Sequence, residues 1–556
     1  MIARANVVPP SDTRAPSATQ PPGPSERPHA LLAAVVLLTF WPALLGTHVA
    51  DDIRLLALNP AIRSADIGAL LTQPMFGAQG GYWRPLTMLT FFAGDALGGA
   101  FGVHAIGLLL HVVNAWAVHA LARRFVGAST ATWVAALFAV HPVQVESVAW
   151  CAAVNDPLWV AATLQAMLAA IRWRENGARG LPWLACLCVF AAMLAKETGA
   201  VAIPLVVAAV WLLPSAGAAP GRRHLASLAA AVVATGALWF LLRSLVQREP
   251  VGALLLGPSV PAFDEFSPLR AVQVLGAQLW LLCWPWPTIC VRSVAPWPDG
   301  SWWPVAGAVA AIAGLGWLLL APLRKELRFA GLLVLAPLVP AALYGRVIGV
   351  YPIADRYLYL CVAGFALALA VLSRVGTWGV VRWLPIAVLA LASFMATWNW
   401  RDAEGLVMHS LAGAPDDPMV LVMAGDLALE RAYRGDGGAL HDARTLYGRA
   451  LAEVGETSRG EQARRAEAKA RVQLGWCTLL RHKRGDSTPA EVISAFEAAT
   501  QFAPREPTAW LGLGAANLEL GRLDAAEAAF QQVLQIEPGS APAASGIERV
   551  QAARRR

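Results

Sequence analysis

Long apolar runs recur through the first 400 residues, separated by short polar segments. Runs of roughly 15 to 20 apolar residues with few charges are typical of helices that cross a membrane, and we expect about eleven of them. They lie near residues 30–47, 103–121, 129–142, 157–171, 181–195, 199–213, 225–246, 302–321, 329–344, 357–372 and 383–399. The segment 268–285 is apolar over a shorter stretch, and we place it outside the membrane plane.

Basic residues between these runs predict how the chain is oriented, because cytoplasmic loops retain Arg and Lys. The spans listed above allow all of these clusters to face the cytoplasm if an even number of spans separates each successive pair. The clusters are Arg4/Arg14/Arg27, Arg123/Arg124, Arg172/Arg174/Arg179, Arg222/Arg223, Arg324/Lys325/Arg328 and Arg374/Arg382. We therefore expect a cytoplasmic amino end and a carboxyl end on the opposite, non-cytoplasmic side.

The two ends of the chain differ from this apolar part. Residues 1–28 are rich in Pro, Ser, Thr and Arg with almost no apolar periodicity, which predicts a disordered cytoplasmic tail. Residues 401–556 carry a repeat, since Trp476 and Trp510, Phe496 and Phe530, and Pro504 and Pro538 are each 34 positions apart. That period is typical of tetratricopeptide repeats, which are pairs of antiparallel helices. A degenerate unit, from Asp426 to Ala450 with Tyr447 at the aromatic position, precedes these two.

Composition supports this division. The chain of 556 residues is 57% hydrophobic and 15% charged, which excludes an ordinary soluble enzyme. About half of the charged residues follow residue 400. The net charge of +7 is spread beside the apolar runs rather than in one stripe, so we expect no nucleic-acid partner. Most of the seven cysteines lie in apolar segments; Cys283 and Cys290 could pair in an oxidising compartment. The fold class is thus all-α, with a polytopic bundle at 29–400 followed by a repeat solenoid.

Candidate chemistry begins with two adjacent carboxylates, Asp51 and Asp52, at the outer mouth of the first span. A carboxylate in a partly desolvated cleft can accept the proton of an attacking hydroxyl. The alternative is that both are solvated loop residues. A magnesium or manganese ion beside them is a further alternative, because hard carboxylates suit those metals, but two acidic residues do not specify one.

More polar side chains accumulate in later loops predicted on the same face. They are Arg84 in "YWRPLT", His141 and Glu146 in "HPVQVESVAW", Lys196 and Glu197 in "LAKETG", and Asp355, Arg356 and Tyr359 in "ADRYLYL". The cations among them could hold a phosphate. The alternative is that Lys196–Glu197 and Asp355–Arg356 are local pairs or headgroup anchors. No glycine-rich phosphate loop or zinc-type spacing is evident, so a nucleotide site is not expected.

One predicted span carries three polar residues on a single helix face. His104, His111 and Asn114 follow one another at spacings of seven and three. Side chains at those spacings share a face, and we expect them to form hydrogen bonds between helices rather than to bind a ligand.

The motifs "DD", "YWRPLT", "FGVHAIGLLLHVVNA", "HPVQVESVAW", "LAKETG" and "ADRYLYL", in this order and followed by the repeats, resemble the transmembrane and tetratricopeptide-repeat O-mannosyltransferases. The resemblance covers about residues 30–538. It implies a glycosyltransferase of the C class, which takes a sugar from a polyprenyl-phosphate carrier on the non-cytoplasmic face and inverts the anomeric centre. It also implies a catalytic carboxylate at Asp51 or Asp52, with Arg356 and Lys196 near the lipid phosphate.

The sequence departs from the family pattern in two loops. Asn155 precedes Asp156 where a basic residue is common, and Asp355 replaces a commoner glutamate. The resemblance still implies a bacterial-type enzyme of the inner membrane that moves mannose or another hexose to a hydroxyl acceptor. The acceptor is expected to be a protein, with the repeats as a binding surface for it or for a partner protein. Two alternatives of other classes are a non-catalytic membrane scaffold and a transporter of lipid-linked sugars.

Overall fold

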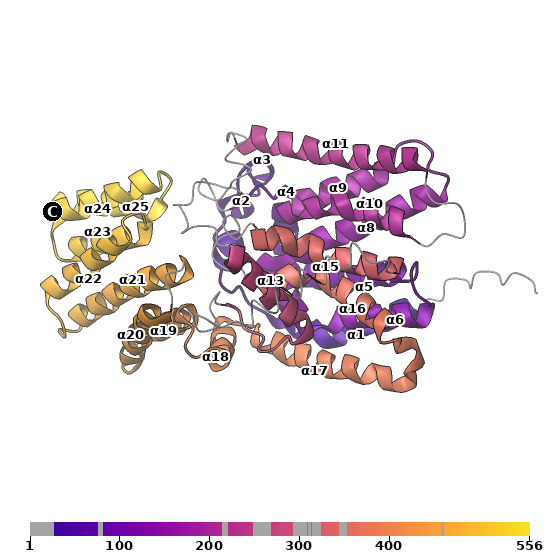
Figure 1. Cartoon of the computed structure of the whole chain (residues 1–556). Helices are drawn as coiled ribbons and strands as arrows, with labels where there is room; N and C mark the ends of the chain where they lie inside the picture. Colours follow the sequence, from indigo (N-terminus) through magenta and orange to yellow (C-terminus); the bar gives the residue numbers. More distant parts are fainter. Residues whose placement is uncertain are drawn as a thin grey trace, which may run out of the picture.

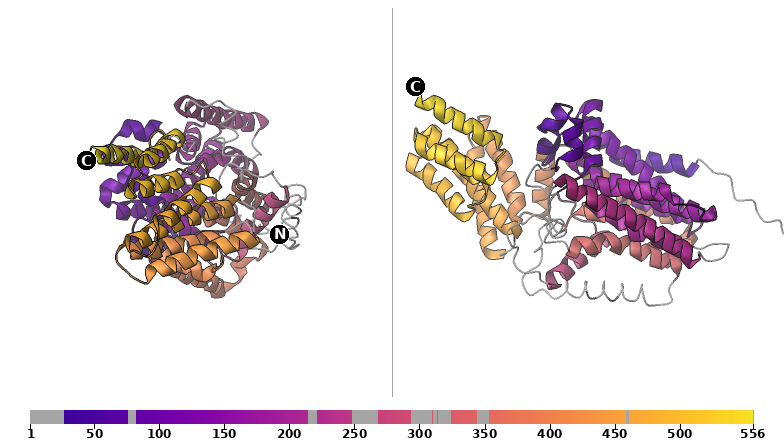
Figure 2. Two further views of the ribbon diagram at one scale, coloured as in Figure 1. Left: turned by 90° about the vertical axis from the view of Figure 1, so that its left-hand side faces the viewer. Right: turned by 90° about the horizontal axis from the view of Figure 1, so that it is seen from above.

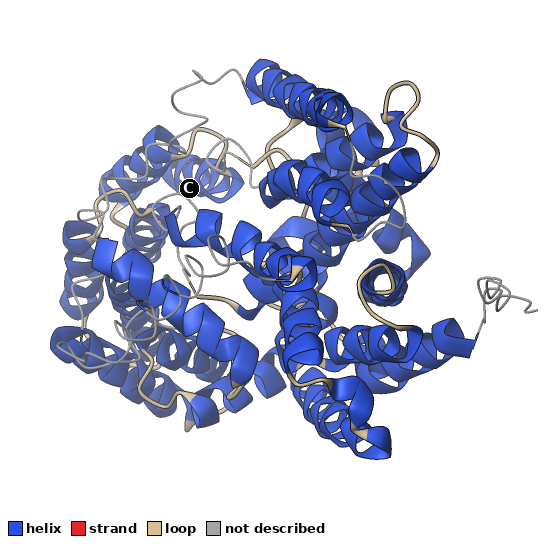
Figure 3. Ribbon diagram, turned by 45° about the vertical axis from the view of Figure 1, so that its right-hand side comes forward, coloured by secondary structure: helices blue, strands red, loops and turns tan. Residues whose placement is uncertain are grey.

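The computed structural model describes residues 27–75, 82–213, 221–247, 268–292, 324–343, 353–457 and 461–555, with the single residues 309 and 313. These residues form helices joined by loops, as the uniform helix colour of Figure 3 shows, and contain no β-strand beyond an isolated bridge between Arg292 and Ile353. The all-α fold class is confirmed. The expected span 302–321, apart from 309 and 313, and residues 1–26 of the expected tail lie outside the described residues.

The first part of the chain is a bundle of roughly aligned helices, drawn in indigo to orange in Figure 1. Its α-helices are α1 (Arg27–Phe40), α2 (Pro60–Arg63), α3 (Ile67–Thr72), α4 (Pro85–Gly98), α5 (Ala100–Ala122), α6 (Ala128–Val140), α7 (Val145–Ala149), α8 (Asn155–Glu175), α9 (Trp183–Ala195), α10 (Ala202–Leu212), α11 (Arg222–Gln247), α13 (Pro268–Cys283), α15 (Lys325–Leu343), α16 (Cys361–Leu372) and α17 (Trp383–Asn399). Short helical turns lie at Trp41–Leu45, Ile53–Ala57, Pro142–Gln144, Cys151–Val154, Glu197–Val201, Asp355–Leu358, Val375–Thr377 and Gly379–Arg382.

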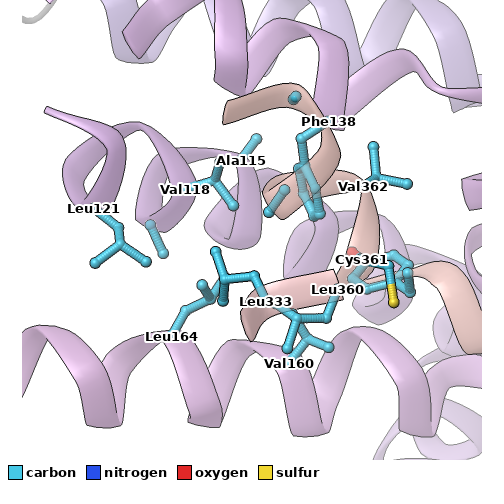
Figure 4. Packing of buried hydrophobic residues seen from close by; sticks show 14 of the residues in the cluster. Ala115, Val118, Leu121, Phe138, Val160, Leu164, Leu333, Leu360, Cys361 and Val362 are labelled. Carbon is cyan, nitrogen blue, oxygen red and sulfur yellow. The ribbon is translucent and has the colours of Figure 1, made fainter. Parts of the chain in front are cut away.

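The core of the bundle is apolar and continuous across its helices. Figure 4 shows Val118 of α5, Phe138 of α6, Val160 of α8, Leu333 of α15 and Val362 of α16 meeting in one packed cluster. Helix α5 is central, since it packs against α1, α4, α6 and α8. Burying aliphatic side chains from five helices fixes the relative positions of the loops at the helix ends.

Four segments among the described residues are long and apolar enough to cross a membrane: Pro28–Leu45, Ala100–Ala122, Arg222–Gln247 and Gly379–Asn399. Five further apolar helices among the described residues are shorter, with 10–17 residues each, so the count of about eleven spans stays a prediction. Segment 268–285, which we place outside the membrane plane, contains helix α13, which packs against α15 and α16 with Leu281 and Leu282 in the bundle core. Its position relative to a membrane stays a prediction. Its apolar part is too short to cross a bilayer alone.

Helix α4 is an element that the sequence did not predict. It begins at Pro85, within "YWRPLT", and packs against α5 and α9. The two helices of the α4–α5 hairpin are in backbone contact. A Cβ added at Gly102 would lie only 2.0 Å from the carbonyl oxygen of Gly94. Only small residues permit such an approach. The hairpin therefore anchors the first outer loop, including Arg84, against the bundle.

The second part of the chain is a stack of paired helices beyond one end of the bundle (Figures 1 and 2). They are α18 (Ala403–Gly413), α19 (Pro418–Tyr433), α20 (Ala439–Thr457), α21 (Glu461–Lys483), α22 (Pro489–Phe502), α23 (Pro507–Glu519), α24 (Leu523–Ile536) and α25 (Ala541–Arg554). The predicted period appears as a repeated contact: Phe496 packs on Gly512, and Phe530 packs on Gly546. Tyr447 packs in the same manner on Gly425, as its place in the degenerate unit predicts.

Candidate functional site

The polar loops singled out in the sequence gather at one end of the bundle. This end holds α2 and α3 and faces the repeat helices in both Figure 1 and Figure 2. The basic loops lie at the other end of α6: Arg382 donates to Ser129 at its start, whereas His141 and Glu146 follow its last residue. Arg124 and Glu175 pair at the ends of α5 and α8. The bundle thus separates the basic loops from the candidate site.

Arg356 is held by a carboxylate from another loop. Its guanidinium forms an ion pair with Glu146, and its backbone N–H donates to the other oxygen of the same carboxylate at 2.8 Å. The guanidinium also lies over the rings of Trp150 and Tyr357, at 5.6 and 5.1 Å from the ring centres. Glu146 is buried on the short helix α7. Two contacts from one carboxylate therefore fix both the backbone and the side chain of Arg356.

Lys196 belongs to the same cluster. Its ammonium lies 2.5 Å from Oδ1 of Asp156, the second residue of α8, and both side chains are almost fully buried. Trp159 donates to the same oxygen at 3.1 Å. The ammonium also lies 5.9 Å from the centre of the Tyr357 ring, the ring that Arg356 covers. The two cations, from loops far apart in the sequence, thus share one aromatic neighbour.

Arg84 completes the set of three cations. Its guanidinium donates to Oε2 of Glu197 from Nε at 2.8 Å and contacts the same oxygen from a second nitrogen at 2.7 Å. It lies 4.6 Å from the centre of the Tyr82 ring. The electrostatic neighbours of Tyr82 include Arg84, Glu197 and Arg356, so this pair adjoins the Arg356 pair.

The interpretation of Lys196–Glu197 and Asp355–Arg356 as local pairs is wrong. Lys196 pairs with Asp156 and Glu197 with Arg84. Asp355 pairs with Arg292 through two hydrogen bonds, of 2.7 and 3.1 Å, whereas Arg356 pairs with Glu146. In each of the two neighbouring pairs, the two residues therefore bind different segments of the chain.

Asp51 and Asp52 differ sharply in their surroundings. Asp51 is exposed. Asp52 is fully buried, and its two oxygens accept the backbone N–H groups of Val49 at 3.0 Å and of Ala152 at 2.7 Å. The indole of Trp150 donates to the backbone carbonyl of Val49 at 3.3 Å, and its ring lies under the Arg356 guanidinium. Asp52 thus joins the first outer loop to the second, and the aspartate pair lies at the same end as Arg356.

Burial shapes the ionisation of these groups. It raises the pKa of Asp52 to about 7, although the two backbone N–H groups oppose that shift. Burial raises the pKa of the Glu146 carboxyl, and Arg356 opposes the change. Burial disfavours the charged form of Arg356, but the Glu146 carboxylate outweighs it and raises the pKa of the guanidinium. Burial lowers the pKa of Lys196, and Asp156 counteracts this. The paired carboxylates therefore favour charged cations in a poorly hydrated site.

The aspartate pair does not fit a metal cage. Among the described residues, no group of three or more His, Cys, Asp and Glu side chains could hold an ion. Both oxygens of Asp52 already accept backbone N–H groups, which leaves Asp51 as the one carboxylate of the pair open to solvent.

Three residues that we expect to bind substrate are buried and contact other groups of the protein. Asp355 uses both oxygens on Arg292, and His141 is buried with Nε2 at 3.1 Å from the carbonyl oxygen of Leu282. Tyr359 is fully buried, with its hydroxyl 2.6 Å from Nδ1 of His111 and 3.1 Å from the amide nitrogen of Asn114. The expected hydrogen bonds between helices are thus present for His111 and Asn114. Direct substrate contact by Asp355, His141 and Tyr359 stays a prediction.

Sequence reasoning missed three residues of the site. Asp156 was visible as a carboxylate in the second outer loop, but its buried pairing with Lys196 was not. Trp150 ends the motif "HPVQVESVAW" and Arg292 lies in no motif, but the roles of both depend on segments distant in the chain. Cys283 and Cys290, which could have paired, are both free thiols.

The comparisons with known proteins agree with the motifs. A tetratricopeptide-repeat family profile matches residues 484–549. The protein O-mannosyl-transferase Tmtc1 of Drosophila melanogaster is 31% identical over 183 residues, which is 31% of this chain and 21% of that protein. A protein O-mannosyl-transferase of Caenorhabditis elegans is 23% identical over 454 residues, which is 76% of this chain and 62% of that protein. The chain spans less than two thirds of the length of either relative.

Among solved structures, the apo oligosaccharyltransferase of Archaeoglobus fulgidus matches with a TM-score of 0.39 and 16% identity, over 75% of this chain and 59% of that one. The resemblance predicted from the order of the loop motifs is confirmed by the sequence matches. The chain is a homologue of the transmembrane and tetratricopeptide-repeat protein O-mannosyl-transferases.

Proposed function

We propose that the chain is an integral-membrane glycosyltransferase whose active site is the loop cluster at the repeat-facing end of the bundle. It transfers a sugar, mannose or another hexose, from a polyprenyl-phosphate carrier to a hydroxyl group. Homology to protein O-mannosyl-transferases supports the reaction class. The apolar helices support a multi-pass membrane location, for which we propose the bacterial inner membrane with the site and the repeats on the periplasmic side.

One observation supports this proposal most directly. Lys196 and Arg356 lie over the same Tyr357 ring, although they come from loops on either side of α10, α11, α13 and α15. Each cation is held by a buried carboxylate. Maintaining two cations against one ring in a poorly hydrated place is costly, and an anionic ligand that offsets their repulsion is the simplest reason for it. The phosphate of a lipid carrier is such an anion, and guanidinium and ammonium groups both bind phosphate.

The proposed reaction is a single in-line displacement. Asp51 accepts the proton of the acceptor hydroxyl as its oxygen attacks the anomeric carbon of the sugar. The new bond forms between that oxygen and the anomeric carbon. The bond from the anomeric carbon to the phosphate oxygen breaks, and its electron pair leaves with the phosphate. Arg356 and Lys196 stabilise the negative charge that develops there.

Asp51 is the better base of the pair because it is open to solvent, whereas Asp52 is enclosed. We assign Asp52 the task of holding the first outer loop against Ala152, so that Asp51 is presented at the site. Arg84 and Glu197 extend the polar wall beside Tyr82.

The repeat helices are proposed to hold the acceptor protein or a partner that delivers it. Repeat solenoids present extended helical surfaces that bind polypeptides. Their place beyond the site end of the bundle, seen in Figure 1, puts such a surface on the side from which an acceptor would approach.

The test uses the purified full-length chain in liposomes, with polyprenyl-phosphate mannose as donor and a Ser- and Thr-containing peptide as acceptor. Asp51→Asn is expected to reduce transfer at least about a hundredfold, the usual contribution of a general base. Asp66→Asn is the matched control. Asp66 lies in the same loop and accepts the N–H of Ala69 as a helix cap, and asparagine caps equally well.

Retention of wild-type transfer by folded Asp51→Asn would remove the base assignment. Absence of transfer by the wild-type chain, together with movement of the lipid-linked sugar across the liposome membrane, would favour the transporter alternative. Absence of both activities with retained peptide binding by the repeats would favour the scaffold.

A further inference from the structure

The segment Pro287–Arg292, here called the strap, connects the candidate site with the first helix of the repeat part. It follows α13 and its last residue, Arg292, reaches the loop that carries Arg356. Its contacts fall into two sets, one at each end.

At the site end, Arg292 fixes the residue immediately before Arg356. Its guanidinium donates from two nitrogens to the two oxygens of Asp355, at 2.7 and 3.1 Å, and both side chains are nearly buried. Its backbone forms an antiparallel bridge with Ile353. A two-point ion pair of this kind sets direction as well as distance. The same guanidinium donates to the carbonyl oxygen of Pro287 at 2.6 Å, so the strap is folded back on itself.

At the repeat end, the strap is bound to α18. The backbone N–H of Cys290 donates to the hydroxyl of Ser410 at 3.1 Å, and Thr288 lies at hydrogen-bond distance from His409. Val291 is buried in the apolar cluster formed by α19, α20 and α21. Gly413, the last residue of α18, lies so close that an added Cβ would be 2.8 Å from Ile289 and 3.1 Å from Pro287.

We propose that the strap transmits the position of the repeat helices to the donor site, with Arg292 as a positioning residue for Arg356. This inference rests on the proposed function of Arg356 at the carrier phosphate. Any shift of α18, for example on binding of an acceptor protein, moves the strap and with it the Asp355–Arg356 loop. The affinity for the lipid-linked sugar is therefore coupled to the state of the repeats.

Two variants test opposite ends of the strap. Arg292→Ala removes the ion pair to Asp355. Gly413→Ala pushes on Ile289 and Pro287 from the repeat side, while alanine favours the helix that contains it. Gly448→Ala is the matched control, since Gly448 is a glycine inside α20 with no atom within 4 Å of an added Cβ.

We expect Arg292→Ala to raise the KM for the lipid-linked sugar by about tenfold or more, the usual value of a charge-assisted hydrogen bond, with a smaller change in kcat. Gly413→Ala shifts the same KM in the same direction, and Gly448→Ala leaves it unchanged. Arg292→Lys, which retains the charge but loses the planar fork, restores part of the affinity. The double variant Arg292→Ala with Asp355→Asn is no worse than either single change.

Hydrogen exchange gives a readout that does not depend on transfer activity. In the purified full chain, the amides of residues 353–358 are expected to exchange faster in Arg292→Ala and Gly413→Ala than in Gly448→Ala. If both strap variants show unchanged exchange and an unchanged donor KM, the proposed coupling through the strap is wrong, while the proposed function is unaffected. If the proposed function is wrong, the wild-type chain shows no sugar transfer. The exchange rates of residues 353–358 still test whether the strap couples the repeat helices to the Asp355–Arg356 loop.

Discussion

Neighbouring residues in the site loops have separate partners because of backbone geometry. Lys196 is in an extended conformation, with φ −158° and ψ 143°. Successive side chains on extended backbone point to opposite sides, so Lys196 and Glu197 cannot easily face each other. Each turns to a different helix and finds Asp156 or Arg84 there. One short turn thereby joins α4, α8 and α9.

Asp52 gives the pH prediction at the residue scale. Burial raises its pKa from 3.8 to about 7, so the folded chain binds this proton more tightly than the unfolded chain. The free energy of unfolding therefore falls as the pH rises from about 4 to about 7, and the loss is complete above that. Asp52→Asn lacks this pH dependence of the free energy of unfolding. Its stability relative to wild type therefore improves as the pH rises from about 4 to about 7.

Thermal unfolding of the two proteins in detergent at several pH values between 4 and 8 measures this difference. Asp66→Asn again serves as a control, because it lies in the same loop and caps α3. Parallel pH profiles for wild type and Asp52→Asn would show that Asp52 is not the source of the dependence.

At the scale of elements, a buried polar network holds the loop with Arg356 to the bundle. The hydroxyl of Tyr359 lies between His111 and Asn114 of α5, and the amide of Gln144 donates to the backbone carbonyl of Tyr359 at 3.3 Å. The imidazole of His111 also reaches the carbonyl oxygen of Ala139 in α6, at 2.9 Å. Hydrogen bonds between apolar helices fix their register, which dispersion contacts alone do poorly.

Tyr359→Phe removes the hydroxyl and one hydrogen bond from each of its two partners on α5, which retain their bonds to Ala139 and Pro157. We expect the free energy of unfolding to fall by about 1 kcal/mol, a typical value for hydrogen bonds between membrane helices. Thermal unfolding measures the loss, with Tyr433→Phe, an exposed tyrosine, as control. The KM for the donor stays unchanged if Tyr359 only supports the loop. If Tyr359→Phe instead loses affinity for the donor and keeps wild-type stability, Tyr359 contacts the substrate.

At the scale of the whole molecule, the bundle places the basic loops and the candidate site at opposite ends. The repeat helices adjoin the site end, as Figures 1 and 2 show. The apolar length between the ends separates two aqueous compartments if the bundle lies in a membrane. The donor site and the acceptor-binding surface would then share one compartment.

Cysteine labelling tests this sidedness. Single cysteines at exposed positions, Arg63→Cys in the first outer loop, Asp436→Cys in the repeats and Arg179→Cys in a basic loop, are introduced with the exposed Cys283 changed to serine. In intact cells with a permeable outer membrane, a membrane-impermeant maleimide is expected to label the first two and to spare the third until the inner membrane is opened. Labelling of Arg63→Cys and Asp436→Cys only after that step would contradict the arrangement.

Much of the fold could be predicted from local pattern. Apolar runs predicted helices at ten of the eleven expected spans, and the 34-residue period predicted the repeat contact of Phe496 and Phe530. Helix α4 was missed because its 14 residues are shorter than a span and lie next to a motif that reads as a loop. Segment 268–285 forms helix α13, whose short apolar stretch packs inside the bundle, and its place relative to the membrane stays a prediction.

The sequence alone determined which residue types stand at each helix end, because periodicity and charge are local properties of the chain. It could not determine which cation meets which carboxylate. Those choices depend on helix ends brought together by the apolar core, and on backbone directions that send neighbouring side chains apart. Tertiary structure alone therefore decided that Asp52 is enclosed and Asp51 open, and that Arg292 holds Asp355.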